Sequence, residues 1–387
     1  EQDNSNSRFV IAEGTIGQIR RTPLGVVLCM GPYNYPLNET FATLIPALLM
    51  GNTVVFKPPQ YGTLLFYPLL EAFRDAFPEG VINTIYAPGA VVVPHMLATG
   101  KINVLALIGS SKVADHLKKQ HPKSHRLRAI LGLDAKNAAI ILPDADLDLT
   151  VKECLLGALS FNGQRCTALK MLIVHESIVD AFLARFTEAL GKLKVGMPWE
   201  AGVNITPLPG LHRTAYMTDA IDDAKAKGAR IVNEGGGTFC QTLFYPAVVY
   251  PVTEGMKLYR EEQFGPLIPV TTFGDIETAL EYVITSDHGQ QVSIFGSDPA
   301  QIGELVDPLV NQVCRVNLNC QCQRGPDVFP FAGRKDSAEG TLSVTDALRA
   351  FSIRSMVAAK QTDDSKALLD AIVNDHQSKF LNTGFIF

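Results

Sequence analysis

The sequence predicts an α/β protein with parallel, doubly wound sheets whose faces are covered by helices. Short apolar runs alternate with stretches of helical periodicity along most of the chain. Gly and Pro close many of the apolar runs, as they do where strands end in turns. Alternating strands and helices are typical of parallel sheets. The 387 residues are enough for two or three domains with a large buried core.

The first part of the chain begins with a predicted hairpin at residues 9–21. We expect strands at 25–30, 54–57, 81–86 and 104–108. Helices are expected at 37–50, 64–77 and 92–98, and another begins at 109–111.

The later part of the chain continues the alternation. Residues 131–142 lead into a turn and cap at 143–148, which open a helix ending near residue 166. We expect strands at 172–175, 247–250, 315–319 and 354–359, and helices at 178–193 and 214–227. Residues 261–266 and 323–327 are predicted to form stiff turns, because each contains a Gly-Pro pair.

Composition excludes several classes of function. The net charge of −5 predicts no nucleic acid partner, and the basic run at 116–128 is interpreted as a solvated helix and turn. No run of about 18 apolar residues predicts a membrane span, and residues 1–7 are polar rather than a signal core. Seven scattered cysteines favour a reducing compartment, the cytoplasm or an organelle. Cys314, Cys320 and Cys322 lack the second ligand pair of a zinc site, so no metal is expected.

Residues 161–167, FNGQRCT, are the candidate reactive stretch. A thiol is a useful nucleophile near neutral pH when a neighbouring cation favours its thiolate, and Arg165 lies directly beside Cys166. A cysteine seen alone is more often buried and inert. Cys166 becomes a candidate nucleophile because several other stretches fit the same chemistry.

Three of those stretches follow predicted strands, where ligands of parallel sheets bind. Asn34 lies in a turn between two prolines, which can hold its amide in one direction. Lys57 and the pair Gly109 and Ser110 could hold a phosphate through a cation and exposed amides. As a plain helix cap, Gly-Ser would need no ligand.

Six motifs together resemble those of the aldehyde dehydrogenase superfamily, most closely its non-phosphorylating, NADP-using glyceraldehyde-3-phosphate dehydrogenase branch. They lie in the order and with similar spacing to that family, and the resemblance extends from about residue 9 to the C-terminus. The motifs are PYNYP at 32–36, FKPP at 56–59, GS at 109–110, FNGQRC at 161–166, EQFGP at 262–266 and QRGPD at 323–327.

The resemblance implies a role for each matching residue. Cys166 would attack the aldehyde carbon, and Asn34 and the Cys166 backbone amide would stabilise the resulting oxyanion. Phe264 would pack against the nicotinamide while Glu262 holds a ribose.

The adenosine side of the cofactor is implied in the same way. Lys57 would contact the adenosine ribose, with Gly109 and Ser110 also binding the cofactor. NAD-preferring relatives carry an acid at the position of Gln60. A neutral residue there does not repel a 2'-phosphate, so NADP is expected, with NAD as the alternative.

The expected substrate is a small phosphorylated aldehyde, glyceraldehyde 3-phosphate. Tyr35, Arg165 and Arg324 match positions that gather around the substrate phosphate in that branch. Guanidinium groups suit phosphate through forked hydrogen bonds. The alternative is that both arginines are structural.

The chain departs from the family pattern where the general base should be. The family's LELGGK stretch reads LGLDAK at 131–136, which places Gly132 at the position of the base and makes Asp134 a weak candidate replacement. The turn at 87–89 and Ala114 also replace usual glycines, so the cofactor space is expected to be altered. About a quarter of a typical member, before residue 1, has no counterpart in the sequence.

Three functions remain open at this point. In the first, the chain oxidises an aldehyde and hydrolyses the thioester slowly. In the second, it passes the acyl group to an acceptor such as coenzyme A. In the third, it is a decayed dehydrogenase that serves as a structural subunit of a larger assembly. We expect a tail and oligomerisation hairpin at 1–22, a truncated cofactor-binding domain at 23–140, a catalytic domain at 141–345, and a C-terminal strand and tail at 346–387. The hairpin and the strand at 354–359 imply a β-arm and a homodimer or tetramer.

Overall fold

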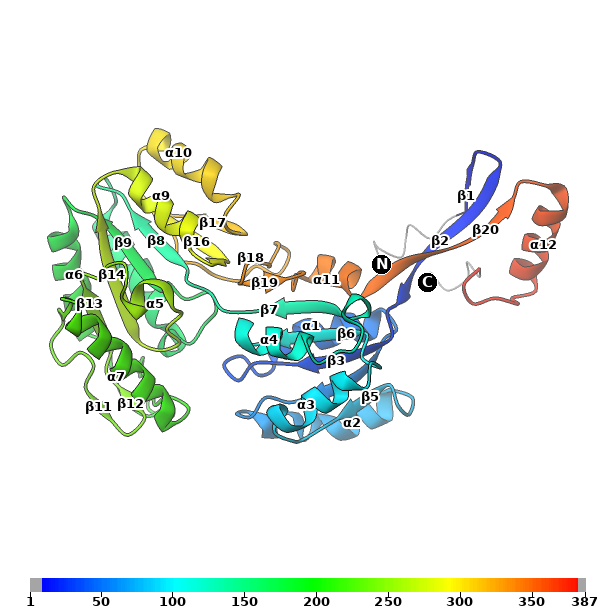
Figure 1. Cartoon of the computed structure of the whole chain (residues 1–387), viewed down its shortest axis with the longest axis horizontal. Coiled ribbons are helices and arrows are strands. Elements are labelled where there is room, and N and C mark those ends of the chain that lie inside the picture. Colours follow the sequence, from blue (N-terminus) through cyan, green and yellow to red (C-terminus); the bar gives the residue numbers. More distant parts are fainter. Residues whose placement is uncertain (1–8, 382–387) are drawn as a thin grey trace.

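The computed structural model describes residues 9–381 and contains two parallel sheets and a projecting β-arm (Figure 1). This architecture confirms the predicted α/β class. The polar stretch at 1–7 lies outside the described residues.

The first sheet has six strands in the order β19-β7-β6-β3-β4-β5. All neighbours run parallel except β19, which is antiparallel to β7. The strands are β3 (Val26–Met30), β4 (Thr53–Lys57), β5 (Ile82–Thr84), β6 (Val104–Ile108), β7 (Arg128–Gly132) and β19 (Ala338–Glu339).

Helices cover both faces of this sheet, as a doubly wound sheet requires. Alternate residues of β3 and β6 pack against α1 (Asn38–Leu49) on one face and against α3 (Gly89–Ala98) and α4 (Ser111–Lys118) on the other. The short elements are η1 (Thr63–Phe66), α2 (Leu69–Ala76) and η2 (Ser124–Arg126).

The second sheet has seven strands in the order β10-β13-β14-β9-β8-β16-β17, parallel apart from β10. The strands are β8 (Ala138–Ile141), β9 (Met171–His175), β10 (Arg230–Ile231), β13 (Ala247–Tyr250), β14 (Leu267–Phe273), β16 (Gln291–Phe295) and β17 (Arg315–Leu318). Two small ribbons accompany it, β11 (Phe239–Cys240) with β12 (Leu243–Phe244), and β15 (His288–Gly289) with β18 (Arg334–Lys335).

This sheet is also covered on both faces. The helices α5 (Leu147–Leu159) and α6 (Val179–Gly191) share one apolar cluster with it, and α7 (Leu211–Ala226), α9 (Ile276–Thr285) and α10 (Pro299–Leu309) share the other. The turn at 261–266 follows the short α8 (Lys257–Arg260), as predicted. α5 begins at the predicted cap, where the Asp146 carboxylate accepts from the amides of Asp148 and Leu149.

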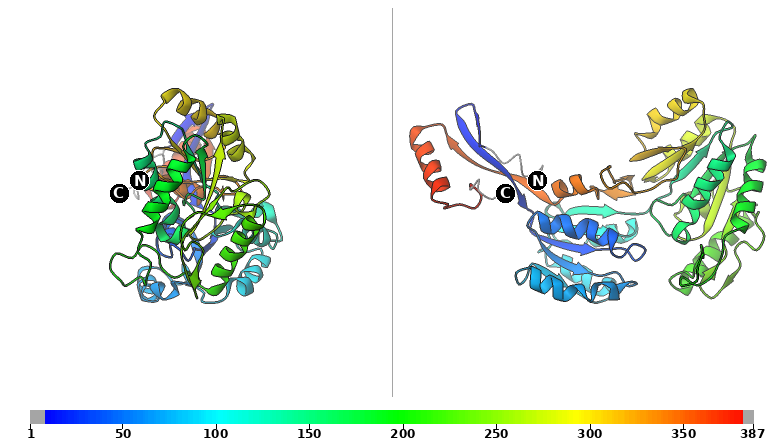
Figure 2. Two further views of the ribbon diagram at one scale, coloured as in Figure 1. Left: turned by 90° about the vertical axis from the view of Figure 1, so that its left-hand side faces the viewer. Right: turned by 180° about the vertical axis from the view of Figure 1, so that it is seen from behind.

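The arm consists of β1 (Phe9–Ala12), β2 (Thr15–Pro23) and β20 (Ser352–Lys360) and extends away from both sheets (Figure 2). The early hairpin and the late strand therefore pair as predicted, with β2 antiparallel to β20 along their whole lengths. α11 (Val344–Ala350) precedes β20 and α12 (Asp363–Asn374) follows it.

Two predicted elements differ from the structure. The single helix expected at 64–77 is wrong, because the chain forms η1 and α2 with Pro68 between them. Proline has no amide hydrogen to donate within the helix, so the helical hydrogen bonding is interrupted there, although Tyr67 and Pro68 keep right-handed helical backbone angles. The strand expected at 81–86 is shorter, covering only β5. The domain boundaries stay a prediction; β19, before the expected boundary at 345, already pairs with the first sheet.

Candidate functional site

The carboxyl ends of adjacent strands gather several of the predicted site residues. β4, β3 and β6 are neighbouring parallel strands, so Lys57 at the end of β4, Asn34 after β3 and Gly109 after β6 follow the same edge of the first sheet. β7 ends at Gly132 on that edge. The segment after β3 then reaches across to the loop that carries Cys166.

The Cys166 loop has an unusual backbone. Phe161, Asn162 and Gly163 have φ angles of 54°, 57° and 69°, so three consecutive residues lie in the left-handed region. A Cβ on Gly163 would come within 2.5 Å of the Gly265 carbonyl oxygen, which explains glycine at this position. Asn162 is held by its side-chain amide, which donates to the Thr206 carbonyl at 3.0 Å and accepts from the Thr206 amide at 2.9 Å. Such fixed, sparsely populated conformations cluster at functional sites.

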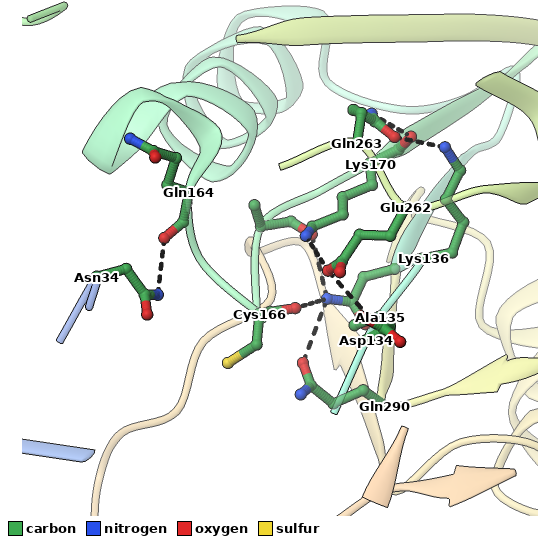
Figure 3. A network of polar contacts seen from close by, with 12 residues as sticks. Asn34, Asp134, Ala135, Lys136, Gln164, Cys166, Lys170, Glu262, Gln263 and Gln290 are labelled. Carbon is green, nitrogen blue, oxygen red and sulfur yellow. Dashed lines mark hydrogen bonds and ion pairs between the residues drawn. The ribbon is translucent and has the colours of Figure 1, made fainter. Parts of the chain in front are cut away.

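Asn34 contacts the cysteine loop directly (Figure 3). Its Nδ2 donates to the Gln164 carbonyl at 2.8 Å, and the hydroxyl of Tyr33 donates to Gln164 Oε1 at 2.9 Å. The amide group carries two hydrogens, so this bond fixes Asn34 and leaves a second donor for another acceptor. The structure thus brings the two predicted catalytic side chains to the same loop.

Cys166 is a partly buried thiol surrounded by charged and amide groups. Its pKa is raised to about 11: burial is the main cause and the negative charge of Glu39 adds to it, while Lys170 and a hydrogen bond with Gln290 oppose the shift. The Cys166 carbonyl accepts from Asn137 Nδ2 at 2.7 Å. The backbone of Cys166 is therefore anchored, and charges of both signs act on its thiol.

Arg165 does not have the role expected from its position in the sequence. Its guanidinium donates to Gln321 Oε1 at 3.0 Å and to the Cys322 carbonyl at 3.4 Å, while the cation that favours the Cys166 thiolate is Lys170. The prediction that Arg165 favours the thiolate is not supported, because the Arg165 guanidinium is bonded to Gln321 and Cys322 and the cation acting on the thiol is Lys170. Arg165 does contact Tyr35, so these two predicted substrate residues lie together.

Glu262 lies on the other side of the cysteine, where a buried cation neutralises it (Figure 3). Its carboxylate forms an ion pair with Lys170 and accepts the Ala135 amide at 3.1 Å. Burial raises the pKa of Glu262, and Lys170 opposes that shift. The ammonium of Lys170 also lies 4.6 Å from the ring centroid of Phe264. Glu262 and Phe264 are therefore organised around Lys170.

The predicted adenosine-side residues occupy a separate part of the site. Lys57 is half-buried, which lowers its pKa, and its ammonium donates to the Pro58 carbonyl at 2.9 Å. A Cβ on Gly89 would come within 3.1 Å of Lys57 Cε, so Gly89 leaves room beside this lysine. Gln60 is exposed. Ser110 caps α4 by accepting the Val113 amide at 3.4 Å.

The position of the expected general base has no room for a side chain without rearrangement. A Cβ on Gly132 would come within 2.9 Å of Leu342 Cδ1. Asp134, the weak candidate replacement, has another function. Its carboxylate accepts from the amide and hydroxyl of Ser111 at 2.7 and 2.6 Å, at the first turn of α4.

Arg324 is paired inside the protein. Its guanidinium forms an ion pair with Glu39 of α1, lies 3.5 Å from an Asp327 oxygen, and lies 4.9 Å from the Phe331 ring centroid. Glu39 carries a buried charge that acts on both Tyr35 and Cys166, since it raises the pKa of each. Arg324 therefore has an internal counterion on the side of the site that holds the predicted substrate residues.

Sequence reasoning missed the residues that connect the predicted ones. Lys170 is a lone cation at the start of an apolar run, which was a usable signal. Glu39 and Asn137 were inside predicted elements and gave no signal of their own. The residues found only in the structure are Glu39, Lys136, Asn137, Gln164, Lys170 and Gln290.

The described residues contain neither a metal-binding cluster nor a membrane-spanning helix. Among residues 9–381, no group of three or more His, Cys, Asp and Glu side chains could hold a metal ion. Within the same range, no helix has the length and apolar composition needed to cross a membrane.

A sequence profile described as aldehyde dehydrogenase family matches residues 2–357. The chain is 37% identical over 352 residues to an NADP-dependent glyceraldehyde-3-phosphate dehydrogenase of Streptococcus equinus, covering 90% of this chain and 70% of that protein. It is 33% identical to the enzyme of the same name from Pisum sativum, covering 88% and 68%.

A solved structure gives the same result. The fold matches an NADP-dependent glyceraldehyde-3-phosphate dehydrogenase from Bacillus halodurans, solved with NADP, with a TM-score of 0.86 at 32% identity. The match covers 93% of this chain and 76% of that one. Part of each relative therefore has no counterpart in the sequence described.

Proposed function

The chain belongs to the aldehyde dehydrogenase family, and we propose from this premise that it oxidises an aldehyde with NADP through a thioester on Cys166. The observation that carries the proposal is the meeting of two separate segments. Asn34, which follows β3 of the first sheet, bonds the loop of Cys166 two residues before the thiol. This hydrogen bond supports the proposal, because it brings an amide donor to the loop that carries the candidate nucleophile.

The side chains support each step that the protein itself would perform. The Cys166 sulfur adds to the aldehyde carbon, and the second N–H of Asn34 and the Cys166 backbone amide stabilise the oxyanion. Deprotonation of the thiol opposes the first step, because burial raises the thiol pKa, which is about 11. Lys170 lowers that pKa and is the cation available to favour the thiolate.

The residues on both sides of Cys166 fit a dinucleotide. Lys57 is a half-buried cation beside a glycine, and Gln60 is neutral and exposed, which suits a 2'-phosphate. Glu262 and Phe264 lie together around Lys170. When bound, NADP supplies the hydride acceptor that turns the thiohemiacetal into a thioester. The same residues would accept NAD with one fewer charge interaction.

Glyceraldehyde 3-phosphate is the proposed substrate. The relatives named above act on it according to their names, and Tyr35 contacts Arg165 near the cysteine. Arg324 is the other candidate for the phosphate, although it is paired with Glu39.

Hydrolysis of the thioester is the step that the structure supports least with side chains. Gly132 provides no base, and Asp134 is bonded to Ser111. A general base usually contributes about a hundred- to ten-thousandfold to such a step. We therefore propose slow deacylation, with transfer to an acceptor such as coenzyme A as one outcome of the test.

A structural role is the second candidate function, and the crowding and internal ion pairing of the site favour it. Leu342 fills the space beside Gly132, and two internal carboxylates occupy Arg324 and the first turn of α4. These features fit a dehydrogenase fold that serves as a structural subunit of a larger assembly.

A stopped-flow burst decides between these functions. The protein is mixed with NADP and glyceraldehyde 3-phosphate, and reduced cofactor is followed beside a Cys166→Ser control. A stoichiometric burst that serine abolishes, followed by slow or acceptor-dependent turnover, supports the enzyme. If the protein shows neither a burst nor NADP binding, the result supports the structural role.

A further inference from the structure

The ion pair between Glu39 and Arg324 is a buried charge interaction that the proposed chemistry does not use. Glu39 lies on the first turn of α1, five residues after Asn34, and its side chain is 8% exposed. The Arg324 side chain is 16% exposed. Because solvent screens such a pair only weakly, the carboxylate competes effectively with any other anion for the guanidinium.

Arg324 is fixed in place by several contacts. Its Nη2 donates to the Leu342 carbonyl at 3.4 Å, and the guanidinium lies over Phe331. A second carboxylate, that of Asp327, lies 3.5 Å away but is 64% exposed. The two carboxylates on one arginine therefore differ in strength, because the exposed pair is screened by water and the buried one is not.

Glu39 also acts on the groups that a substrate would touch. Its negative charge raises the pKa of both Cys166 and Tyr35, so its field reaches the nucleophile and the Tyr35–Arg165 contact. A phosphate approaching Arg324 from the cysteine would meet this charge at short range. Like charges at short range in a partly buried site repel strongly.

We propose that Glu39 is a specificity-determining residue that competes with the substrate phosphate for Arg324. A phosphorylated aldehyde then binds well only when its phosphate displaces the Glu39 carboxylate, whereas an uncharged aldehyde leaves the ion pair intact. The inference rests on the proposed function in one respect, the reaction of the aldehyde at Cys166.

The first arm of the test measures anion binding and needs no activity. Thermal unfolding is followed with added inorganic phosphate at constant ionic strength for the wild type, Glu39→Gln and the matched control Asp327→Asn. Phosphate should stabilise Glu39→Gln at millimolar concentrations but neither of the other two proteins. Adding Arg324→Gln to Glu39→Gln should abolish the gain. Equal stabilisation of wild type and Glu39→Gln overturns the proposal.

Glu39→Met, which has similar volume and no charge, replaces the glutamine variant if that protein does not fold. Strong stabilisation of the wild type by millimolar phosphate contradicts the proposal whatever the variants do.

The second arm uses two aldehydes that differ only in the phosphate. The burst rate constant per molar substrate is measured for glyceraldehyde 3-phosphate and glyceraldehyde. Glu39→Gln should raise the ratio of the two by about tenfold, because it removes one like charge. Asp327→Asn should leave the ratio within about twofold, as for an exposed pair.

An equal effect of Glu39→Gln on both aldehydes overturns the inference. The absence of a burst from every protein with either aldehyde instead contradicts the proposed function, and the phosphate-binding arm then decides the inference alone.

Discussion

At the scale of single residues, Cys166 is a partly buried thiol whose reactivity depends on the charges around it. Burial and Glu39 raise its pKa, whereas Lys170 lowers it, and the result is about 11. At neutral pH the thiolate is therefore a small fraction in the free protein. Arg165 does not change this balance, because its guanidinium is bonded to Gln321 and Cys322.

The alkylation of Cys166 should follow this pKa. Between pH 7 and 10 the rate with iodoacetamide should rise about tenfold per pH unit, because only the thiolate reacts. Glu39→Gln removes a negative charge, so it should lower the pKa and shift the profile to lower pH. Peptide mass spectrometry separates Cys166 from the exposed Cys240, which serves as a reference for the reagent. A rate that already levels off at pH 8 would contradict this prediction.

Gly132 can be tested as the missing base with two substitutions. Gly132→Ala adds a Cβ 2.9 Å from Leu342 Cδ1 and should cost about 1 kcal/mol in the free energy of unfolding, the low end for overpacking. Gly132→Glu has the same Cβ and adds a carboxylate at the position that carries the base in the family motif. We expect it to raise steady-state turnover by about a hundredfold over the alanine variant.

The alanine variant is the control for this comparison, since both proteins carry the crowded Cβ. Urea unfolding measures the stability and formation of reduced cofactor measures the turnover. Equal turnover of the two variants would mean that the absence of a base at Gly132 does not limit deacylation.

The sequence identified the chemistry of the site better than its electrostatics. Cys166, Asn34, Glu262 and Phe264 were predicted from local motifs; in the structure Asn34 contacts the Cys166 loop, while Glu262 and Phe264 lie around Lys170. The ion pairs with Lys170 and Arg324 join residues 92 and 285 positions apart, counted from Lys170 to Glu262 and from Glu39 to Arg324. Local patterns carry no information on such pairs, because the fold alone brings them together.

At the scale of elements, the N-terminus of α4 is bonded to the carboxylate of Asp134, which lies where the family motif has a glycine. Helix N-termini at the ends of parallel strands bind phosphates through free amides. The Ser111 amide and hydroxyl are already bonded to Asp134, which follows β7 of the same sheet. An internal carboxylate thus occupies part of a position where a cofactor phosphate would bind.

Asp134→Asn should therefore tighten NADP binding. The amide oxygen can still accept one bond from Ser111, while the negative charge that repels a phosphate is removed. We expect the dissociation constant for NADP to fall about threefold to tenfold, measured by titration calorimetry. Asp115→Asn removes an exposed acid from the same helix and should have no such effect. Weaker binding by Asp134→Asn would show that the carboxylate supports the site rather than competing for it.

Most helices and strands were predicted from the periodicity of apolar residues, and the predictions that failed have local causes. The strand expected at 104–108 matches β6 because its apolar run is bounded by polar and glycine residues. The helix expected at 64–77 failed because Pro68 was included in its pattern.

At the scale of the whole molecule, the arm leaves apolar side chains exposed away from both sheets. β1 and β20 are the two edges of its three-stranded sheet. Ile11, Ile353 and Met356 are 58%, 48% and 60% exposed. Open strand edges with apolar side chains are prone to pair with another chain. The arm therefore fits the predicted role in oligomerisation.

Charges placed on the arm should separate the subunits of the predicted homodimer or tetramer. The double variant Ile11→Glu, Met356→Glu puts a carboxylate on each edge strand, which opposes burial of those edges against a second chain. Analytical ultracentrifugation should show a shift toward monomer. In solutions dilute enough to separate the subunits, the variant and the wild type should have the same thermal midpoint, because both subunits are folded. Val91→Glu, at a 59% exposed position on α3, is the matched control and should keep the wild-type assembly. Equal assembly of the arm variant and the wild type would assign association to another surface, and a monomeric wild type would contradict the predicted oligomer itself.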